Sequence, residues 1–171
     1  MNIRYATMAD LDDIASVEAE CFPVLEAATK EEFEQRIKYY GNHFWLMFDD
    51  DKLIAFVDGF VTDEANLTDE MYENASMHNE NGAWQMIFGV NTLPEYRRCG
   101  YAKELIKKAI LDAREQNRRG LVLTCKESLV PYYSKFGFVD EGITDKSTHG
   151  NVLWHQMRLD FKLRNNGVKQ I

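Results

Sequence analysis

The chain of 171 residues lacks the features that mark several large classes of protein. It has three cysteines and no CxxC pair, so neither a disulfide framework nor a cysteine-rich zinc site is expected. No run of about 18 apolar residues occurs, which argues against a membrane-spanning helix. Positive charge is also scarce. The 20 Lys and Arg against 28 Asp and Glu leave a net charge of −8, which disfavours nucleic acid or an anionic membrane as the main partner.

The rest of the composition is that of an ordinary globular protein, with 45% apolar and 28% charged residues. We expect a single domain over residues 1–161 and a polar tail over 162–171. The opening segment has no apolar signal-peptide core. With Cys21, Cys99 and Cys125 interpreted as reduced thiols, this predicts a cytoplasmic protein. The four histidines show no metal-ligand spacing, so no metal is expected.

Two familiar phosphate-binding motifs are also missing: the chain contains no GxxxxGK[ST] and no GxGxxG opening a βαβ unit. A different strand–turn–helix unit stands at residues 83–113. It begins with the apolar run 84–90, and after a break containing Pro94 the apolar period changes to that of a helix. The residues that form the helix face are Leu105, Ile106, Ala109, Ile110 and Ala113.

The turn of this unit combines two arginines with a glycine at the start of the helix. The first N–H groups of a helix have no partner within it, and Gly100 removes a side chain where a ligand would approach the backbone. This predicts an anion site suited to a phosphate or pyrophosphate. The same residues alone also fit a helix N-terminus with two solvated arginines. The expected site residues are Arg97, Arg98, Cys99, Gly100, Tyr101 and Ala102.

Periodicity and turn signals predict an α/β protein in the order β α α β β (α) β α β α β β. The long helix between the strands at 84–90 and 121–125 predicts that these two strands are parallel. The other strands are expected at 3–5, 43–48, 53–61, 138–141 and 152–159. The other helices are expected at 10–21, 29–40, 69–77 and 128–136.

The segment 130–138, VPYYSKFGF, resembles the last helix of the GNAT family of N-acetyltransferases, and RRCGYA resembles that family's signature [RQ]-x-x-G-x-[GA]. Arg97, Gly100 and Ala102 fill the required positions, and the order of elements agrees over about residues 2–160. The resemblance implies a mixed, mostly antiparallel central sheet with one splayed parallel strand pair and helices on both faces. CFPVLEAAT and the loop 62–78 further resemble the serotonin (arylalkylamine) N-acetyltransferase branch.

The resemblance implies an enzyme that uses acetyl-CoA and acetylates a small-molecule amine by direct attack, as a monomer or homodimer. The backbone of Phe88, Gly89 and Val90 would pair with the pantetheine arm, and the 98–102 amides would hold the pyrophosphate. Tyr133 would protonate the leaving thiolate, although a core aromatic also fits that position. The branch resembled lines its acceptor pocket with segments that correspond here to Phe22, Pro23, Trp84 and Met86.

Trp84 and Met86 stand where the branch carries two histidines that take the ammonium proton, and neither side chain can do so. The general base is therefore missing or has moved, and the replacements considered are Glu26, His78 and a backbone-held water. Two alternatives remain open. One is acetylation of a polyamine or of a protein amino group, and the acidic charge suits a polyamine better than an aromatic monoamine. The other is a non-catalytic acyl-CoA sensor.

Overall fold

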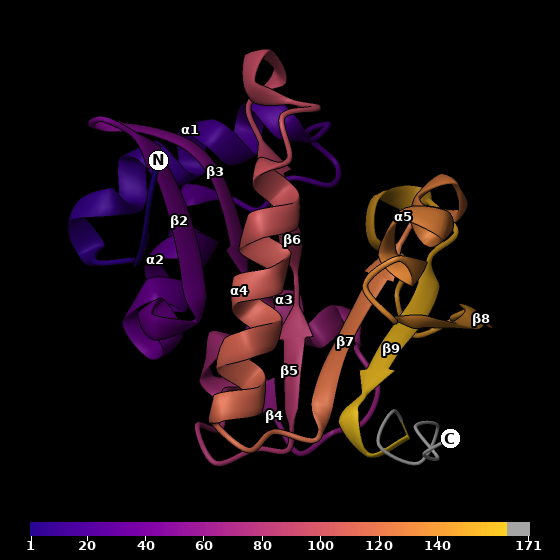
Figure 1. Ribbon diagram of the computed structural model, residues 1–171. Helices are drawn as coiled ribbons and strands as arrows, with labels where there is room; N and C mark the ends of the chain where they lie inside the picture. Colours follow the sequence, from indigo (N-terminus) through magenta and orange to yellow (C-terminus); the bar gives the residue numbers. More distant parts are fainter. Residues whose placement is uncertain (164–171) are drawn as a thin grey trace, which may run out of the picture.

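The computed structural model describes residues 1–163, and its strands form two sheets that meet along the segment 84–92 (Figure 1). The first sheet has the order β1-β2-β3-β6, and all of its neighbouring strands are antiparallel. Its strands are β1 Asn2–Tyr5, β2 Phe44–Asp49, β3 Lys52–Asp58 and β6 Gly89–Thr92. The second sheet has the order β4-β5-β7-β9-β8. Its strands are β4 Val61–Thr62, β5 Trp84–Ile87, β7 Gly120–Cys125, β8 Val139–Ile143 and β9 His155–Asp160.

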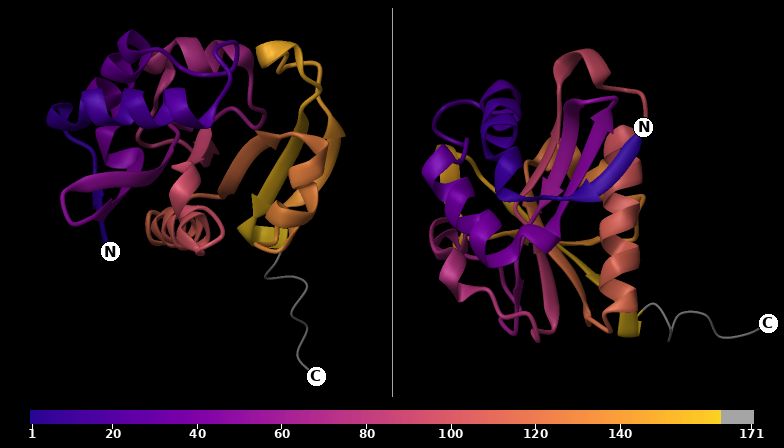
Figure 2. Two further views of the ribbon diagram at one scale, coloured as in Figure 1. Left: turned by 90° about the horizontal axis from the view of Figure 1, so that it is seen from above. Right: turned by 90° about the vertical axis from the view of Figure 1, so that its left-hand side faces the viewer.

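Helices cover both faces of the sheets, with α4 on one side and α1 and α2 on the other (Figure 2). The α-helices are α1 Leu11–Cys21, α2 Lys30–Tyr40, α3 Asp69–Glu73, α4 Tyr101–Glu115 and α5 Val130–Ser134. Short 3-10 turns are η1 Met8–Asp10, η2 Gly41–His43, η3 Ala75–Met77, η4 Pro94–Tyr96, η5 Glu127–Leu129 and η6 His149–Asn151. None of the helices within residues 1–163 is long and apolar enough to cross a membrane.

The expected α/β fold is confirmed, including the parallel pair: β5 and β7 run parallel and the remaining strand pairs are antiparallel. The hydrophobic core is divided by the sheets. One cluster under α1 and α2 includes Ile14 and Phe33, and the other under α4 includes Leu105 and Leu123. An amphipathic helix is stabilised by burying its apolar face in this way. The spacing of the apolar residues of α4 in the sequence therefore predicts which face of the helix packs against the sheet.

Several element boundaries differ from those expected. The run 84–90 is two strands, β5 and β6, interrupted at Phe88, and the run 53–61 is likewise divided into β3 and β4. The two breaks are neighbours in the fold: Phe88 N donates to Asp58 O at 2.7 Å, and Met86 N donates to Phe60 O at 2.8 Å. The two segments therefore pass from one sheet to the other side by side. The expected helix 69–77 is α3 followed by η3. Residues 164–171 of the expected tail lie outside the described residues.

Candidate active site

The parallel strands β5 and β7 separate after Ile87, the last β5 residue in register with β7, where it stands opposite Leu123 (Figure 1). Beyond that point β6 pairs with β3 instead, with Gly89 opposite Asp58. β6 is an edge strand of its sheet, so its outer edge presents backbone N–H and C=O groups toward the opening. An extended ligand with amide groups could bind there as an added strand.

A cavity of about 460 Å³ occupies this region. Its walls come from the end of α1 and the following segment, α2, α3, the β5–β6 junction, the end of β7 and α5. The lining includes Phe88, Gly89 and Val90 on one side and Phe22, Pro23 and Glu26 on the other. The structure thus brings together the expected pantetheine segment and part of the expected acceptor pocket.

The lining of this cavity is rich in acidic side chains. Glu18, Glu26, Glu32, Asp69 and Glu73 contribute carboxyl groups, whereas the basic lining residues are Arg36 and Lys126. A cavity lined mainly by one sign of charge attracts molecules of the other sign. The cavity is therefore suited to a cationic molecule.

The predicted anion turn lies at the start of α4 and outside the cavity lining. Gly100 is the N-cap of α4 and has a φ of 84°, a left-handed conformation that glycine adopts without strain. A Cβ at Gly100 would meet nothing within 4 Å, so the backbone here is open. Arg97 and Arg98 are exposed beside it, and Arg97 Nε donates to Thr92 O at 3.0 Å. Open helix amides with two cations fit the phosphate groups of a coenzyme.

Tyr133 lies on α5, is buried, and lines the cavity. Its ring packs edge-on against Tyr132 and Phe138. Burial raises the pKa of the Tyr133 phenol far above its usual value, and the nearby Cys125 raises it further. The phenol therefore keeps its proton across the physiological range and can donate it into the cavity.

Glu26 also lines the cavity, but Lys126 lies against it from the segment after β7. Lys126 Nζ is 2.9 Å from Oε1 and 3.2 Å from Oε2 of Glu26. The Glu26 side chain is only 6% exposed, so this ion pair is partly shielded from water. To accept a proton from an amine, Glu26 would have to give up part of this interaction. Its predicted role as the base is therefore less well supported by geometry than its role in lining the cavity.

Trp84 and Met86 are not among the residues that line this cavity, and their place in the acceptor pocket stays a prediction. Both are buried in the core on the half of β5 that is still paired with β7, opposite Gly120 and Val122. The Trp84 ring lies under Arg158, whose guanidinium carbon is 4.6 Å from the ring centroid. The lining contributed by this segment begins at Ile87 and continues to Val90.

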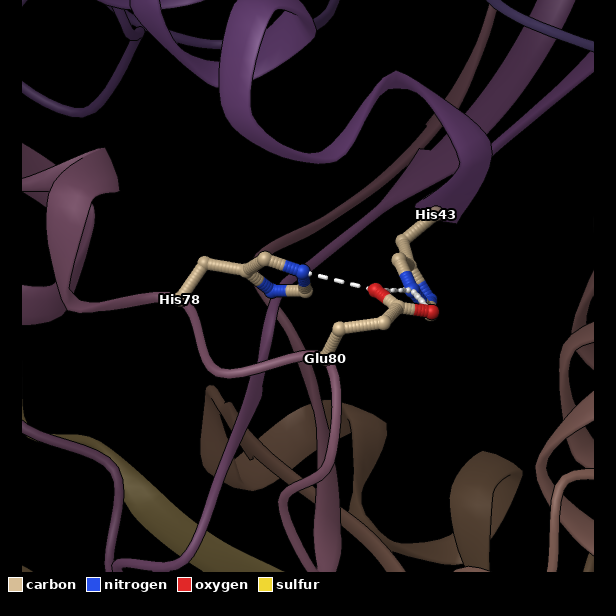
Figure 3. Close-up of side chains that lie close together, drawn as sticks. All are labelled: His43, His78 and Glu80. Atoms are coloured by element: carbon tan, nitrogen blue, oxygen red, sulfur yellow. Dashed lines mark hydrogen bonds and ion pairs between the residues drawn. The ribbon is translucent and has the colours of Figure 1, made fainter.

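His78, another candidate base, lies instead in a cluster with His43 and Glu80 (Figure 3). Both histidines point their Nε2 atoms at Glu80 Oε2, each at 2.8 Å. None of the three lines the cavity. His78 therefore lies away from the position that a base acting on the acceptor would need.

The hydrogen bonds around this cluster define where its protons lie. Gln85 Nε2 donates to three backbone carbonyls, so Gln85 Oε1 accepts from His43 Nδ1 at 2.9 Å. His43 Nε2 lies 3.1 Å from Oε1 and 2.8 Å from Oε2 of Glu80. Val61 N donates to His78 Nδ1 at 3.0 Å, and burial lowers the pKa of His78. His78 Nδ1 is therefore engaged by the backbone, and Nε2 is the ring atom directed at Glu80.

Replacing Glu80 by Gln should lower the free energy of unfolding by about 1–2 kcal/mol, because it removes a charged acceptor shared by two buried rings. Burial raises the pKa of Glu80, but the hydrogen bonds with His43 and His78 outweigh this and lower the pKa overall. The contribution of these bonds is therefore present above the ordinary pKa of a glutamate and is lost as pH falls through the lowered value. Urea unfolding near neutral pH measures the loss. Glu64→Gln, at an exposed loop position, is the control and should change stability by less than about 0.5 kcal/mol. Equal stabilities of the two variants would contradict this account of the cluster.

Glu18 is a buried cavity residue that the sequence reasoning missed. It lies on α1 and its side chain accepts from Ala28 N at 3.4 Å. Burial, with the charge of Asp58, raises the pKa of Glu18 to about 8 against the opposing effect of Arg36. A signal was present in the sequence: Glu18 follows Val17 within the apolar stripe of α1, where a charged residue is unusual.

Comparison with known proteins agrees with this architecture. Residues 11–138 match the model of the acetyltransferase (GNAT) family. The serotonin N-acetyltransferase of Mesocricetus auratus is 30% identical over 93 residues, which cover 53% of this chain and 43% of that protein. The chain therefore matches less than half the length of that curated relative.

Two solved structures share the fold. The loading GNATL domain of CurA from Lyngbya majuscula has a TM-score of 0.82 at 17% identity, covering 95% of this chain and 98% of that one. The GphF GNAT-like decarboxylase in complex with isobutyryl-CoA has a TM-score of 0.77 at 16% identity, covering 94% of this chain and 99% of that one. At these identities the similarity concerns the fold alone.

Proposed function

The chain belongs to the acetyltransferase (GNAT) family, and we propose that it transfers the acetyl group of acetyl-CoA to the primary amine of a small molecule. The observation that carries this proposal is one cavity whose lining includes the edge strand β6, the buried Tyr133 and several acidic side chains. One region offers backbone to a thioester-bearing arm, and the other offers negative charge to an amine.

The residues on the coenzyme side fit acetyl-CoA. The edge of β6, reached from Phe88 to Val90, can pair with the amide groups of a pantetheine arm, and the open turn at Gly100 can hold the pyrophosphate. When bound, acetyl-CoA supplies a thioester whose carbonyl carbon is open to attack by an amine. Tyr133 would then donate its proton to the departing sulfur, because it lines the cavity from α5 and its phenol is protonated at neutral pH.

The acceptor side supports a cationic amine. Phe22 and Pro23 provide apolar contact, and the carboxylates around them stabilise an ammonium group. The similarity to a serotonin N-acetyltransferase supports an arylalkylamine. The excess of acidic lining residues equally supports a polyamine, so both belong in the first test.

A screen of acceptors should show thiol release from acetyl-CoA with tryptamine-like amines, with polyamines, or with both, because each places an ammonium group among acidic side chains. Thiol detection measures the rate, and mass spectrometry identifies the acetylated nitrogen. Reactions without acceptor provide the background. Acetylation of peptide amines alone would exclude the small-molecule acceptor. Tight acetyl-CoA binding by calorimetry with no turnover on any amine would favour a sensor.

A further inference from the structure

Three buried polar side chains converge on Gly89, at the point where β6 begins. Asn91 lies two residues further along the strand and therefore on the same face, and Asp58 is directly opposite Gly89 on β3. Glu18 reaches the same point from α1. A Cβ placed on Gly89 would lie 3.0 Å from Asn91 Nδ2, 3.2 Å from Asp58 Oδ1 and 3.9 Å from Glu18 Oε1. These groups therefore surround one position beside a strand that lines the cavity.

Two of these side chains have unused hydrogen-bonding capacity although they are fully enclosed. Asp58 is 1% exposed and Asn91 is 0% exposed. Within the part of the chain that the structure describes, Asp58 Oδ1 and both polar atoms of the Asn91 amide have no hydrogen-bond partner. Buried polar groups are normally paired, because an unpaired one loses its bonds to water without replacement. Asp58 and Asn91 do not line the cavity themselves, so the unpaired atoms beside Gly89 are suited to a buried water molecule.

The charges around Glu18 suit a proton acceptor. Glu18 faces Asp58 from β3, Arg36 and Glu32 from α2, and Cys21 from its own helix. Arg36 Nη1 donates to Asp58 Oδ2 at 3.1 Å, which engages one oxygen of that carboxylate and leaves Oδ1 toward Gly89. Glu18 has no comparable cation at hydrogen-bond distance among the described contacts. Its pKa of about 8 lies between neutral pH and the pKa near 10 of an ordinary amine.

We propose that Glu18 takes the proton from the acceptor ammonium, directly or through one water, while Asp58 and Asn91 act as positioning residues beside Gly89. The N–H bond breaks, its electron pair stays on nitrogen, and the proton goes to a Glu18 carboxylate oxygen. Glu18 later releases that proton to solvent. This inference rests on the proposed function, because it requires an amine acceptor.

The experiment compares the pH dependence of kcat/KM for the amine in the wild-type protein and in Glu18→Gln, from about pH 6 to about pH 10. In the wild type the rate should rise through an apparent pKa near 8, the value of Glu18, and then level off. In Glu18→Gln the step near 8 should vanish and the rate should rise until the amine itself deprotonates. Near pH 7.5 the loss should approach about 10²-fold, because only roughly 0.3% of an amine with a pKa near 10 is neutral there.

A second acceptor separates proton removal from a structural effect. A weakly basic primary amine, such as trifluoroethylamine, is already neutral near pH 7.5 and needs no base to lose an ammonium proton. Glu18→Gln should therefore acetylate it at close to the wild-type rate. Glu20→Gln, the same change at an exposed position of α1, is the matched control and should leave the pH profile unchanged.

An unchanged pH profile in Glu18→Gln would overturn the proposal, and so would equal losses with both acceptors. If Glu18→Gln does not fold, Glu18→Asp serves instead, because it keeps the charge but withdraws the carboxylate by one methylene. Glu18→Asp should lower kcat/KM for the amine while kcat/KM still rises with pH through an apparent pKa. A kcat/KM equal to that of the wild type would overturn the proposal. A wild-type protein that acetylates no amine would contradict the proposed function and not the assignment of Glu18 within it.

Discussion

Tyr133→Phe is expected to lower kcat by about 10²- to 10⁴-fold while leaving the affinity for acetyl-CoA nearly unchanged. The substitution removes one hydroxyl group, and the ring with its packing against Tyr132 and Phe138 remains. An interaction used mainly in the transition state shows this pattern of lowered kcat with preserved binding. Thiol release measures kcat, and calorimetry measures the affinity.

Tyr132→Phe is the matched control for this variant. Tyr132 is the preceding residue of α5, is partly buried and does not line the cavity, so loss of its hydroxyl should leave kcat within about twofold of the wild type. Full activity in Tyr133→Phe would leave Tyr133 as a core aromatic and would require another proton donor.

Gly100→Val is expected to weaken acetyl-CoA binding by about 10- to 100-fold, or about 1.4–2.8 kcal/mol. A β-branched residue is strained at a φ of 84°, and the turn must distort to relieve that strain. The added methyl groups would also stand over the open amides at the start of α4. Calorimetry with acetyl-CoA measures the change.

Gly142→Val controls for backbone strain without a change at the turn. Gly142 has a φ of 90° and, like Gly100, a Cβ added there would meet nothing within 4 Å. Gly142 lies in β8 and outside the cavity lining, so its substitution should affect stability but not affinity. Equal affinities of a folded Gly100→Val protein and the wild type would show that the turn does not hold the phosphates.

Local patterns in the sequence were sufficient to predict most elements and the family. The change of apolar period after Pro94 located α4, and the segment around Tyr133 located α5. These signals work because the residues that determine a helix or a turn are close neighbours in the sequence. The division of the run 84–90 at Phe88 was not predictable in this way, because an apolar run does not indicate in which sheet each of its residues will pair.

The composition of the site depended on long-range contacts. Lys126 pairs with Glu26 from a position 100 residues away, and Asp58 meets Gly89 through the pairing of β3 with β6. Trp84 and Met86 lie on the part of β5 that is still paired with β7, whereas the lining contributed by this segment begins at Ile87. By itself, the sequence determined the family, the α/β fold and the glycine turn, because these depend on local spacing. Only the tertiary structure decided which carboxylates surround the cavity and how burial shifts the pKa of Glu18, because both depend on where the two sheets diverge.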